Sequence, residues 1–210
     1  MQIAIALFDR FTALDAVGPY DTLSRIPGAE TVFVAQRPGP VRGESGSLAL
    51  VADRSFADVP EPDVIVVPGG PGTSDHMADE SLLGWLRSAD ATSTWTTSVC
   101  TGSLLLACAG LLAGRRATSH WLALAELARL GADATEERVV FDGKYVTAAG
   151  VSSGIDMGIA LIGRIAGEEQ AQTVQLLTEY DPQPPYDAGS PHKAPAHLVE
   201  RFRAGSRFSQ

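Results

Sequence analysis

Cysteine is scarce in this sequence, which contains only Cys100 and Cys108 among 210 residues. Two cysteines cannot form a disulfide framework or a four-cysteine zinc site. If a helix begins at Cys100, then Cys108 lies about two turns along it, roughly 12 Å away by helical rise, which is too far for a disulfide bond. We therefore expect two reduced thiols, as is typical of a cytoplasmic protein.

Long apolar runs and positive charge are also lacking. No run approaches the roughly 18 apolar residues of a membrane span, and the start, "MQIAIALFDRF", lacks the basic residues and cleavage site of a signal peptide. With 16 Lys and Arg against 25 Asp and Glu, the net charge is −9. Because phosphate backbones repel such a chain, we expect no nucleic-acid partner and no membrane partner.

The sequence does contain apolar strand-like runs that alternate with helix-like segments. "DVIVVPGG" is a continuous apolar run closed by glycines, as expected of a central parallel strand buried on both faces. The alternation predicts a doubly wound, mostly parallel α/β sheet with helices on both faces, built as one domain over residues 1–210. "SGSLALVADRSF" (45–56) is expected to form a side hairpin, and Asp142-Gly143 is a hairpin turn signal.

The carboxyl-terminal part differs in composition. The segment from Asp181 to Pro195 contains five prolines, so it cannot be a helix or a central strand. We expect an ordered arm that begins at about residue 181 and packs on the body or on a partner subunit. About 15 residues follow this segment, which is too few for a further domain.

In "SVCTGSLLL", Cys100 lies between a strand-like run and a helix-like run that is expected to continue to Gly114. A residue on such a strand-to-helix elbow is exposed at the sheet edge, where it can act as a nucleophile. The start of the helix favours negative charge, so we expect the Cys100 pKa to be lowered. The same position also suits a small buried apolar residue. Cys108 lies within the apolar helix and is expected to be structural.

Two other strand ends carry suggestive residues. In "VVPGGPG", glycines follow a buried strand, and the N–H of Gly70 or Gly72 could form an oxyanion hole with the N–H of Thr101, although a simple tight turn is the alternative. In "LDAVGP", Asp15 lies among apolar neighbours after the first strand. Burial would raise the pKa of its carboxyl, as general acid/base catalysis at neutral pH requires, although a first-turn acid is the alternative.

The histidines do not add a metal site. His120 in "ATSHW" could in principle pair with a cysteine, but the sequence favours a structural role. His76, His192 and His197 lie in polar stretches and read as surface residues, and no spacing of metal ligands is present. We expect no metal and no organic cofactor.

The order "LDAVGP … VVPGGPG … SVCTGSLLLACAGLLAGRRATSHW … AGVSSGIDMG" resembles the PfpI-type branch of the class I glutamine-amidotransferase-like superfamily over nearly the whole chain. This branch includes peptidase-like, deglycating and isocyanide-hydrating members. The Asp after the first strand, the Thr after the cysteine and the tail "QPPYDAGSP" are most similar to the isocyanide-hydrating members. The resemblance implies a flavodoxin-like fold and a homodimer with sites near the interface.

The resemblance also implies roles for five residues. Cys100 matches the nucleophile, Asp15 the acid/base that hydrogen-bonds the thiol, and Thr101 a residue that catalyses or positions. Gly70 matches the oxyanion-hole region, and Val151 in "AGVSSG" matches a position whose backbone approaches the cysteine. Peptidase-like members commonly have His after the cysteine, so Thr101 argues against peptide cleavage.

The activity that the resemblance implies is hydration of a small-molecule isocyanide to an N-formamide, through a covalent thioimidate on Cys100. Two alternatives remain open from the sequence. One is a glyoxalase- or deglycase-like enzyme that uses the same Cys-acid pair. The other is a non-enzymatic redox sensor, because an exposed cysteine with a low pKa is readily oxidised to sulfinic acid.

Overall fold

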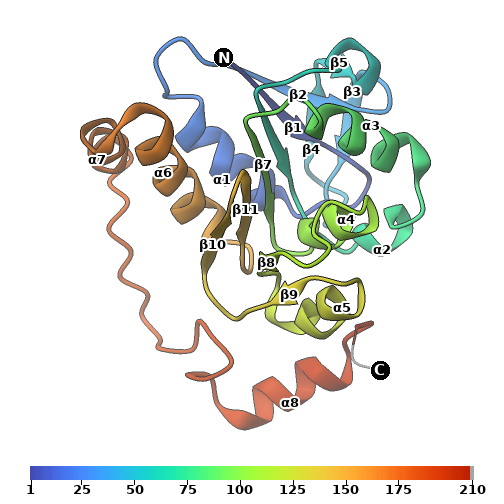
Figure 1. The fold of residues 1–210 in the computed structure, drawn as a ribbon. Helices are drawn as coiled ribbons and strands as arrows, with labels where there is room; N and C mark the ends of the chain where they lie inside the picture. Colours follow the sequence, from blue (N-terminus) through green and yellow to red (C-terminus); the bar gives the residue numbers. More distant parts are fainter. Residues whose placement is uncertain (209–210) are drawn as a thin grey trace.

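The computed structural model describes residues 1–208, and its centre is a seven-stranded sheet in the order β10-β11-β7-β6-β1-β2-β5 (Figure 1). Every neighbouring pair is parallel except β10 and β11, which form an antiparallel hairpin. The strands are β1 (Gln2–Ala6), β2 (Glu30–Ala35), β5 (Arg54–Ser55), β6 (Val64–Val67), β7 (Trp95–Val99), β10 (Val139–Asp142) and β11 (Tyr145–Ala148).

Helices cover both faces of this sheet, with α1, α6 and α7 on one side and α2, α3 and α4 on the other (Figure 1). The helices are α1 (Ala13–Leu23), α2 (Thr73–His76), α3 (Glu80–Asp90), α4 (Gly102–Cys108), α5 (Leu124–Arg129), α6 (Ser153–Ala166), α7 (Glu168–Leu177) and α8 (Ala196–Ala204), with short 3₁₀ helices at Phe56–Asp58 and Trp121–Ala123. The doubly wound α/β prediction is therefore confirmed.

The central strands are apolar because both of their faces are covered. All four residues of β6, Val-Ile-Val-Val, are fully buried, and so are Ile3 to Ala6 in β1. Parallel strands between two helical layers require such continuous apolar runs. The carboxyl ends of β1, β6, β7 and β11 meet along one edge of the sheet, where an open α/β sheet binds its ligands.

The side hairpin lies earlier in the chain than predicted. It pairs β3 (Gly39–Arg42) with β4 (Ala49–Ala52), whereas Arg54–Ser55 leaves the hairpin and joins the main sheet as its edge strand. A second small sheet pairs β8 (Arg116–Ala117) with β9 (Asp133–Ala134). The hairpin predicted at Asp142-Gly143 is present as β10 and β11.

Helix α4 is shorter than predicted, because it ends at Cys108 and not near Gly114. Gly110 has a φ of 83°, a left-handed conformation that glycine adopts without strain and that commonly ends a helix. Gly114 also has a positive φ of 68°, but it follows a stretch of turns. Cys108 is consequently a half-buried residue at the end of α4, and both cysteines are free thiols.

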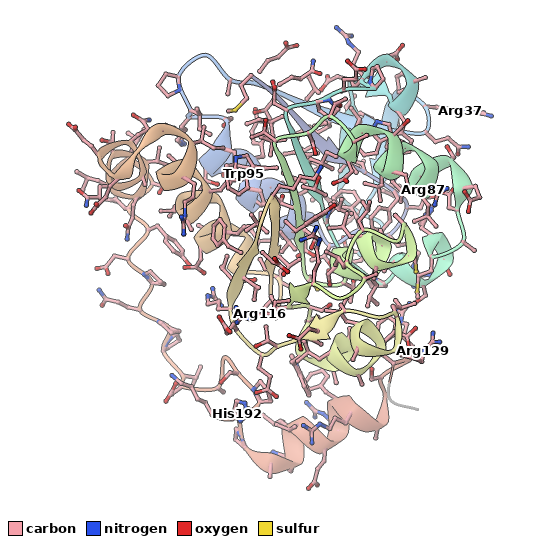
Figure 2. The ribbon with its side chains drawn as sticks, viewed as in Figure 1. Arg37, Arg87, Trp95, Arg116, Arg129 and His192 are labelled. Atoms are coloured by element: carbon pink, nitrogen blue, oxygen red, sulfur yellow. The ribbon has the colours of Figure 1, made fainter. Side chains whose placement is uncertain are left out.

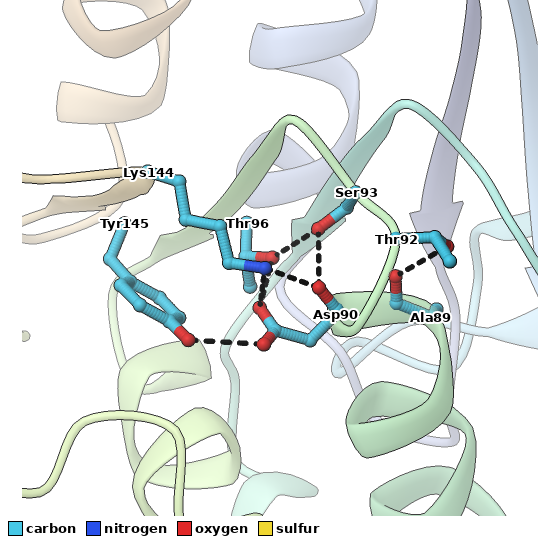
Figure 3. A network of polar contacts seen from close by, with 7 residues as sticks. All are labelled: Ala89, Asp90, Thr92, Ser93, Thr96, Lys144 and Tyr145. Carbon is cyan, nitrogen blue, oxygen red and sulfur yellow. Dashed lines mark hydrogen bonds and ion pairs between the residues drawn. The ribbon is translucent and has the colours of Figure 1, made fainter.

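A polar network connects the ends of β7 and β11 that lie opposite the ligand-binding edge (Figure 3). The buried carboxylate of Asp90 accepts hydrogen bonds from Thr96 Oγ1 at 2.6 Å and from the Tyr145 hydroxyl at 3.0 Å. Lys144 Nζ lies 3.2 Å from the same carboxylate. A buried carboxylate with these partners is compensated, so we assign the network a structural role.

The proline-rich segment 181–195 contains no helix or strand, as its composition predicted. It runs beside the body and leads into α8, which lies under α5 (Figure 1). His192 lies on this arm (Figure 2). It forms a hydrogen bond with Glu136. Within residues 1–208, every helix is too short or too polar to cross a membrane.

Candidate active site

Cys100 lies at the turn between β7 and α4 in a strained conformation. Its φ is 58°, in the left-handed region that residues other than glycine rarely adopt. Its N–H donates to the carbonyl oxygens of Ala148 (3.0 Å) and Ala149 (2.8 Å), and its own carbonyl accepts from Ser103 Oγ (3.2 Å) and Ser119 Oγ (3.0 Å). These four hydrogen bonds hold the elbow in its strained geometry.

Asp15 in the first turn of α1 faces the Cys100 thiol. The carboxyl is fully buried, and its Oδ2 accepts a hydrogen bond from Gly69 N–H at 2.9 Å. Its Oδ1 is buried and accepts no well-aligned hydrogen bond from residues 1–208, which leaves it free for the thiol proton. One oxygen therefore fixes the carboxyl, and the other is available for proton transfer.

Burial is the main influence on the pKa values of this pair. It raises the pKa of Asp15 from 3.8 to about 7, and the hydrogen bond from Gly69 and the contact with Cys100 only partly oppose that rise. Burial also raises the pKa of the Cys100 thiol, and the nearby Asp15 charge raises it further. The predicted lowering of the Cys100 pKa is therefore wrong, because desolvation exceeds the effect of the helix start. Burial therefore favours the neutral form of both groups.

Thr101 has a side chain that does not cap α4 but joins the end of β6 to α2. Its Oγ1 accepts the N–H of Gly70 at 3.0 Å and lies 2.8 Å from Thr73 Oγ1. All three residues follow strand ends or turns at the same sheet edge, so the pairing holds the glycine turn against the elbow. Thr73 was missed by the sequence analysis, although a hydroxyl directly after the glycine turn was a usable signal.

Two glycines make the close approach of β6 and α4 possible. A Cβ on Gly102 would lie 2.1 Å from the Val67 carbonyl oxygen, and a Cβ on Gly69 would lie 2.5 Å from both the N and the Oγ1 of Thr101. The sequence suggested that the glycines after β6 admit a ligand. In the structure, they admit the first residues of α4 to the end of a neighbouring strand.

Two of the four candidate backbone amides face the Cys100 sulfur. The N–H groups of Thr101 and Val151 interact with Cys100 Sγ and act to lower its pKa. The N–H of Gly70 already donates to Thr101 Oγ1, and that of Gly72 donates to the Arg10 carbonyl at 3.1 Å. Charge on the sulfur is thus met by two amides, from α4 and from the loop after β11.

A cavity of about 450 Å³ opens above Cys100. Its walls include Gly70, Thr101, His120 and Val151. They also include residues that the sequence did not place here: Thr12, Glu44, Pro71, Leu122, Arg201, Phe202 and Gly205 to Phe208. The structure therefore places all five predicted site residues at one sheet edge: Cys100, Asp15, Thr101, Gly70 and Val151.

His120 lines this cavity but forms no hydrogen bond with Cys100 among residues 1–208. Its Nδ1 accepts the N–H of Leu122 at 3.3 Å and so caps the short helix that follows. Burial lowers the pKa of the His120 imidazole, and the hydrogen bond that Nδ1 accepts from Leu122 requires that nitrogen to be unprotonated. This geometry agrees with the structural role that the sequence favoured.

Glu44 reaches the cavity from the β3–β4 hairpin and accepts a hydrogen bond from Thr12 Oγ1 at 3.2 Å. Its charge contributes slightly to the raised pKa of Asp15. No signal near Glu44 in the sequence connects it with Asp15. Within the described part of the chain, three or more His, Cys, Asp or Glu side chains nowhere converge in a group that could hold a metal ion.

A cysteine on a strained strand-to-helix elbow, with a buried carboxyl from another strand end, defines an α/β protein with a nucleophile elbow. The chain belongs to the DJ-1/PfpI family, whose model matches residues 1–164. It is 44% identical over 203 residues to an isonitrile hydratase from Pseudomonas putida, covering 97% of this chain and 89% of that protein.

Other relatives share less of the sequence. DJ-1 homolog A from Arabidopsis thaliana is 33% identical over 176 residues, which cover 81% of this chain and 44% of that protein. The crystal structure of a ThiJ/PfpI family protein from Pseudomonas syringae superposes with a TM-score of 0.95 at 38% identity. That alignment covers 99% of this chain and 87% of the other.

Proposed function

We propose that this protein is an enzyme that hydrates organic isocyanides to N-formamides. The observation that carries the proposal is the buried pair of Cys100 and Asp15, in a chain that is similar over almost its full length to an isonitrile hydratase. An isocyanide has an electrophilic terminal carbon that also carries a lone pair. It therefore needs both a nucleophile and a proton donor at one atom, and this pair supplies both.

In the first step, the Asp15 carboxylate accepts the proton of the Cys100 thiol while the sulfur attacks the terminal carbon. Asp15 then delivers that proton to the carbon, and the product is a thioimidate, R–N=CH–S–Cys100. A pKa of about 7 suits Asp15 to both transfers, because the carboxyl exchanges protons readily near neutral pH. The N–H groups of Thr101 and Val151 stabilise the charge that develops on the sulfur.

In the second step, Asp15 accepts a proton from a water molecule whose oxygen attacks the thioimidate carbon, and gives that proton to the nitrogen. The carbon–sulfur bond then breaks, and the hydroxyl proton returns through Asp15 to the sulfur. The products are R–NH–CHO, a free Cys100 thiol and an Asp15 carboxylate. One isocyanide and one water are consumed, and the pair returns to its starting state.

Incubation of the purified protein with several isocyanides, followed by NMR of the products, tests the proposal. Formamide should form, and an adduct of protein plus isocyanide should appear on Cys100 by intact mass when turnover is slowed. Cys100→Ala should abolish product formation. Cys108→Ala is the matched control, because Cys108 lies at the far end of α4 outside the cavity, and it should retain wild-type turnover.

Two other outcomes would replace the proposal. If all isocyanides remain unchanged while methylglyoxal is consumed, the protein is a glyoxalase- or deglycase-like enzyme. If neither class of compound reacts but peroxide adds oxygen to Cys100, a redox sensor is the better assignment. Both tests use the same cysteine, so Cys100→Ala serves as the negative control throughout.

We also propose one domain over residues 1–210, a homodimer and a cytoplasmic location. The homodimer is supported by exposed apolar side chains on α1 and α7, where Leu14, Leu176 and Leu177 are 41%, 79% and 64% exposed. The location is supported by the two free thiols. Light scattering on the purified protein tests the homodimer, and a mass of about 22 kDa, that of one chain, would contradict it.

A further inference from the structure

The end of the chain forms one wall of the cavity above Cys100. Phe202, near the end of α8, and Phe208 line it together with Cys100. The match to the DJ-1/PfpI family model stops at residue 164, so this wall lies outside the part of the chain that the family model describes. We propose that Phe202 and Phe208 select isocyanides with an aryl or similarly bulky apolar group; this inference rests on the proposed function.

The wall is attached to the site itself. Arg207 Nη1 donates to the carbonyl oxygen of Pro71, in the turn after β6, and lies 3.3 Å from Ser74 Oγ in α2. In α8, the Arg203 guanidinium lies 5.9 Å from the centre of the Trp121 ring. Val199 on the same helix is buried. These contacts hold α8 and Arg207 against the body. Phe208 packs against the core, whereas Phe202 is 53% exposed at the mouth of the cavity.

The distribution of polar groups in the cavity matches an isocyanide with a large apolar body. The groups that would act on the isocyanide carbon, Cys100, Asp15 and the two amides, gather at the sulfur. Other polar residues, among them Glu44, His120 and Arg207, line the cavity elsewhere. An isocyanide is polar only at its N≡C end, so the rest of the molecule is left for the apolar walls. Leu122, Val151 and the two phenylalanines supply those walls.

The size of the cavity also favours an isocyanide with a large apolar group. An apolar cavity of about 150 Å³ is sufficient to hold benzene, whereas this cavity measures about 450 Å³. Methyl isocyanide would leave most of this space unfilled. Contact between aromatic rings adds to the gain from simple burial. A benzyl or aryl group should therefore be preferred over a methyl group.

Steady-state kinetics with benzyl isocyanide and methyl isocyanide test the proposal. In Phe202→Ala, kcat/KM for benzyl isocyanide should fall about 10-fold, mainly through a higher KM, while the value for methyl isocyanide should change less than about 2-fold. Phe208→Ala should act in the same direction. The control is Tyr186→Ala, which removes an 81% exposed aromatic ring from the proline-rich arm, outside the cavity, and should change the kinetics of neither substrate.

Arg207 is a positioning residue in this proposal, because it acts through the two aromatic rings. Arg207→Ala should reproduce the loss of selectivity, with the effect again in KM for the larger substrate, and Arg207→Lys should restore part of it. Equal losses for both substrates in the phenylalanine variants would overturn the proposal, and so would unchanged kinetics with both.

A second readout does not depend on isocyanide turnover. Cys100 can be alkylated with iodoacetamide and with N-benzyliodoacetamide, and the modification followed at Cys100 by peptide mass spectrometry. Phe202→Ala should lower the rate ratio of the benzyl to the parent reagent about 10-fold. If the wild type hydrates no isocyanide but shows this change, the proposed function fails while the wall's preference for bulky groups stands. An unchanged rate ratio would overturn the proposed selectivity of Phe202 for bulky groups.

Discussion

The Gly69 amide holds the Asp15 carboxyl by a 2.9 Å hydrogen bond across 54 residues of sequence, and thereby aims it at Cys100. Only one oxygen of the carboxyl is held, so the other can exchange a proton with the thiol. Asp15→Asn keeps the hydrogen bond to Gly69 but cannot transfer the proton. Turnover should fall by about 10²–10⁴-fold, as measured by formamide production. Near-wild-type turnover would remove Asp15 from the acid/base role.

The same substitution should stabilise the fold. Because burial raises the pKa of folded Asp15 from 3.8 to about 7, the wild type loses stability as the pH rises from about 4 to about 7. Asp15→Asn removes this loss, which amounts to at most about 4 kcal/mol for a shift of about three pKa units. Chemical denaturation at pH 4 and pH 8 should show a larger gain at pH 8. An equal gain at both values would show that Asp15 does not titrate in this range.

The pH dependence of activity follows from the same pair. The reaction needs one proton shared between Asp15 and Cys100, so a doubly protonated pair is inactive. Since the pKa of Asp15 is about 7 and burial raises that of the thiol, kcat/KM should rise with pH through about 7 and then remain level into the alkaline range. A pH-rate profile from 5 to 9 checks this. A profile that already falls above pH 7 would contradict a buried, protonated thiol.

Much of the sheet and the position of the elbow were predictable from the sequence, because strand and helix periodicities are local. Cys100 follows an apolar run and precedes a helix, so its position at the sheet edge follows from topology alone, but the exposure expected there is wrong, because Cys100 is buried. The direction in which the Cys100 pKa shifts was not predictable, because burial depends on the residues that cover the site. The hydrogen bond from Gly69 to Asp15 was not predictable either, and the same holds for Phe202 in the cavity wall. Both bring together residues that are distant in the sequence.

The role of the Thr101 hydroxyl can be tested with one variant that removes it but keeps the shape of the side chain, and one that keeps it. Thr101→Val leaves the Gly70 N–H without its acceptor and Thr73 Oγ1 without a partner in a buried site. An unsatisfied buried polar group costs about 1–3 kcal/mol, so the free energy of unfolding should fall by that amount, and activity should fall as well. Thr101→Ser keeps the hydroxyl and should retain most of both. Equal behaviour of the two variants would show that the hydroxyl is not needed.

The close approach of β6 and α4 gives a prediction with a matched control in another helix. Gly102→Ala would place a Cβ 2.1 Å from the Val67 carbonyl oxygen, so α4 would have to move away from the end of β6. Because the start of α4 also carries the Cys100 elbow, we expect a loss of about 3 kcal/mol or more in the free energy of unfolding, together with loss of activity.

The control is Gly84→Ala in α3, where the added Cβ meets only the end of the Arg87 side chain at 3.8 Å. Alanine is favoured over glycine within a helix by about 0.5–1 kcal/mol, so this variant should be slightly more stable than the wild type and fully active. Denaturant titration of the two variants measures the difference. If Gly102→Ala were as stable as Gly84→Ala, α4 would not need its tight contact with the end of β6, and the elbow would owe its geometry to the four hydrogen bonds at Cys100 alone.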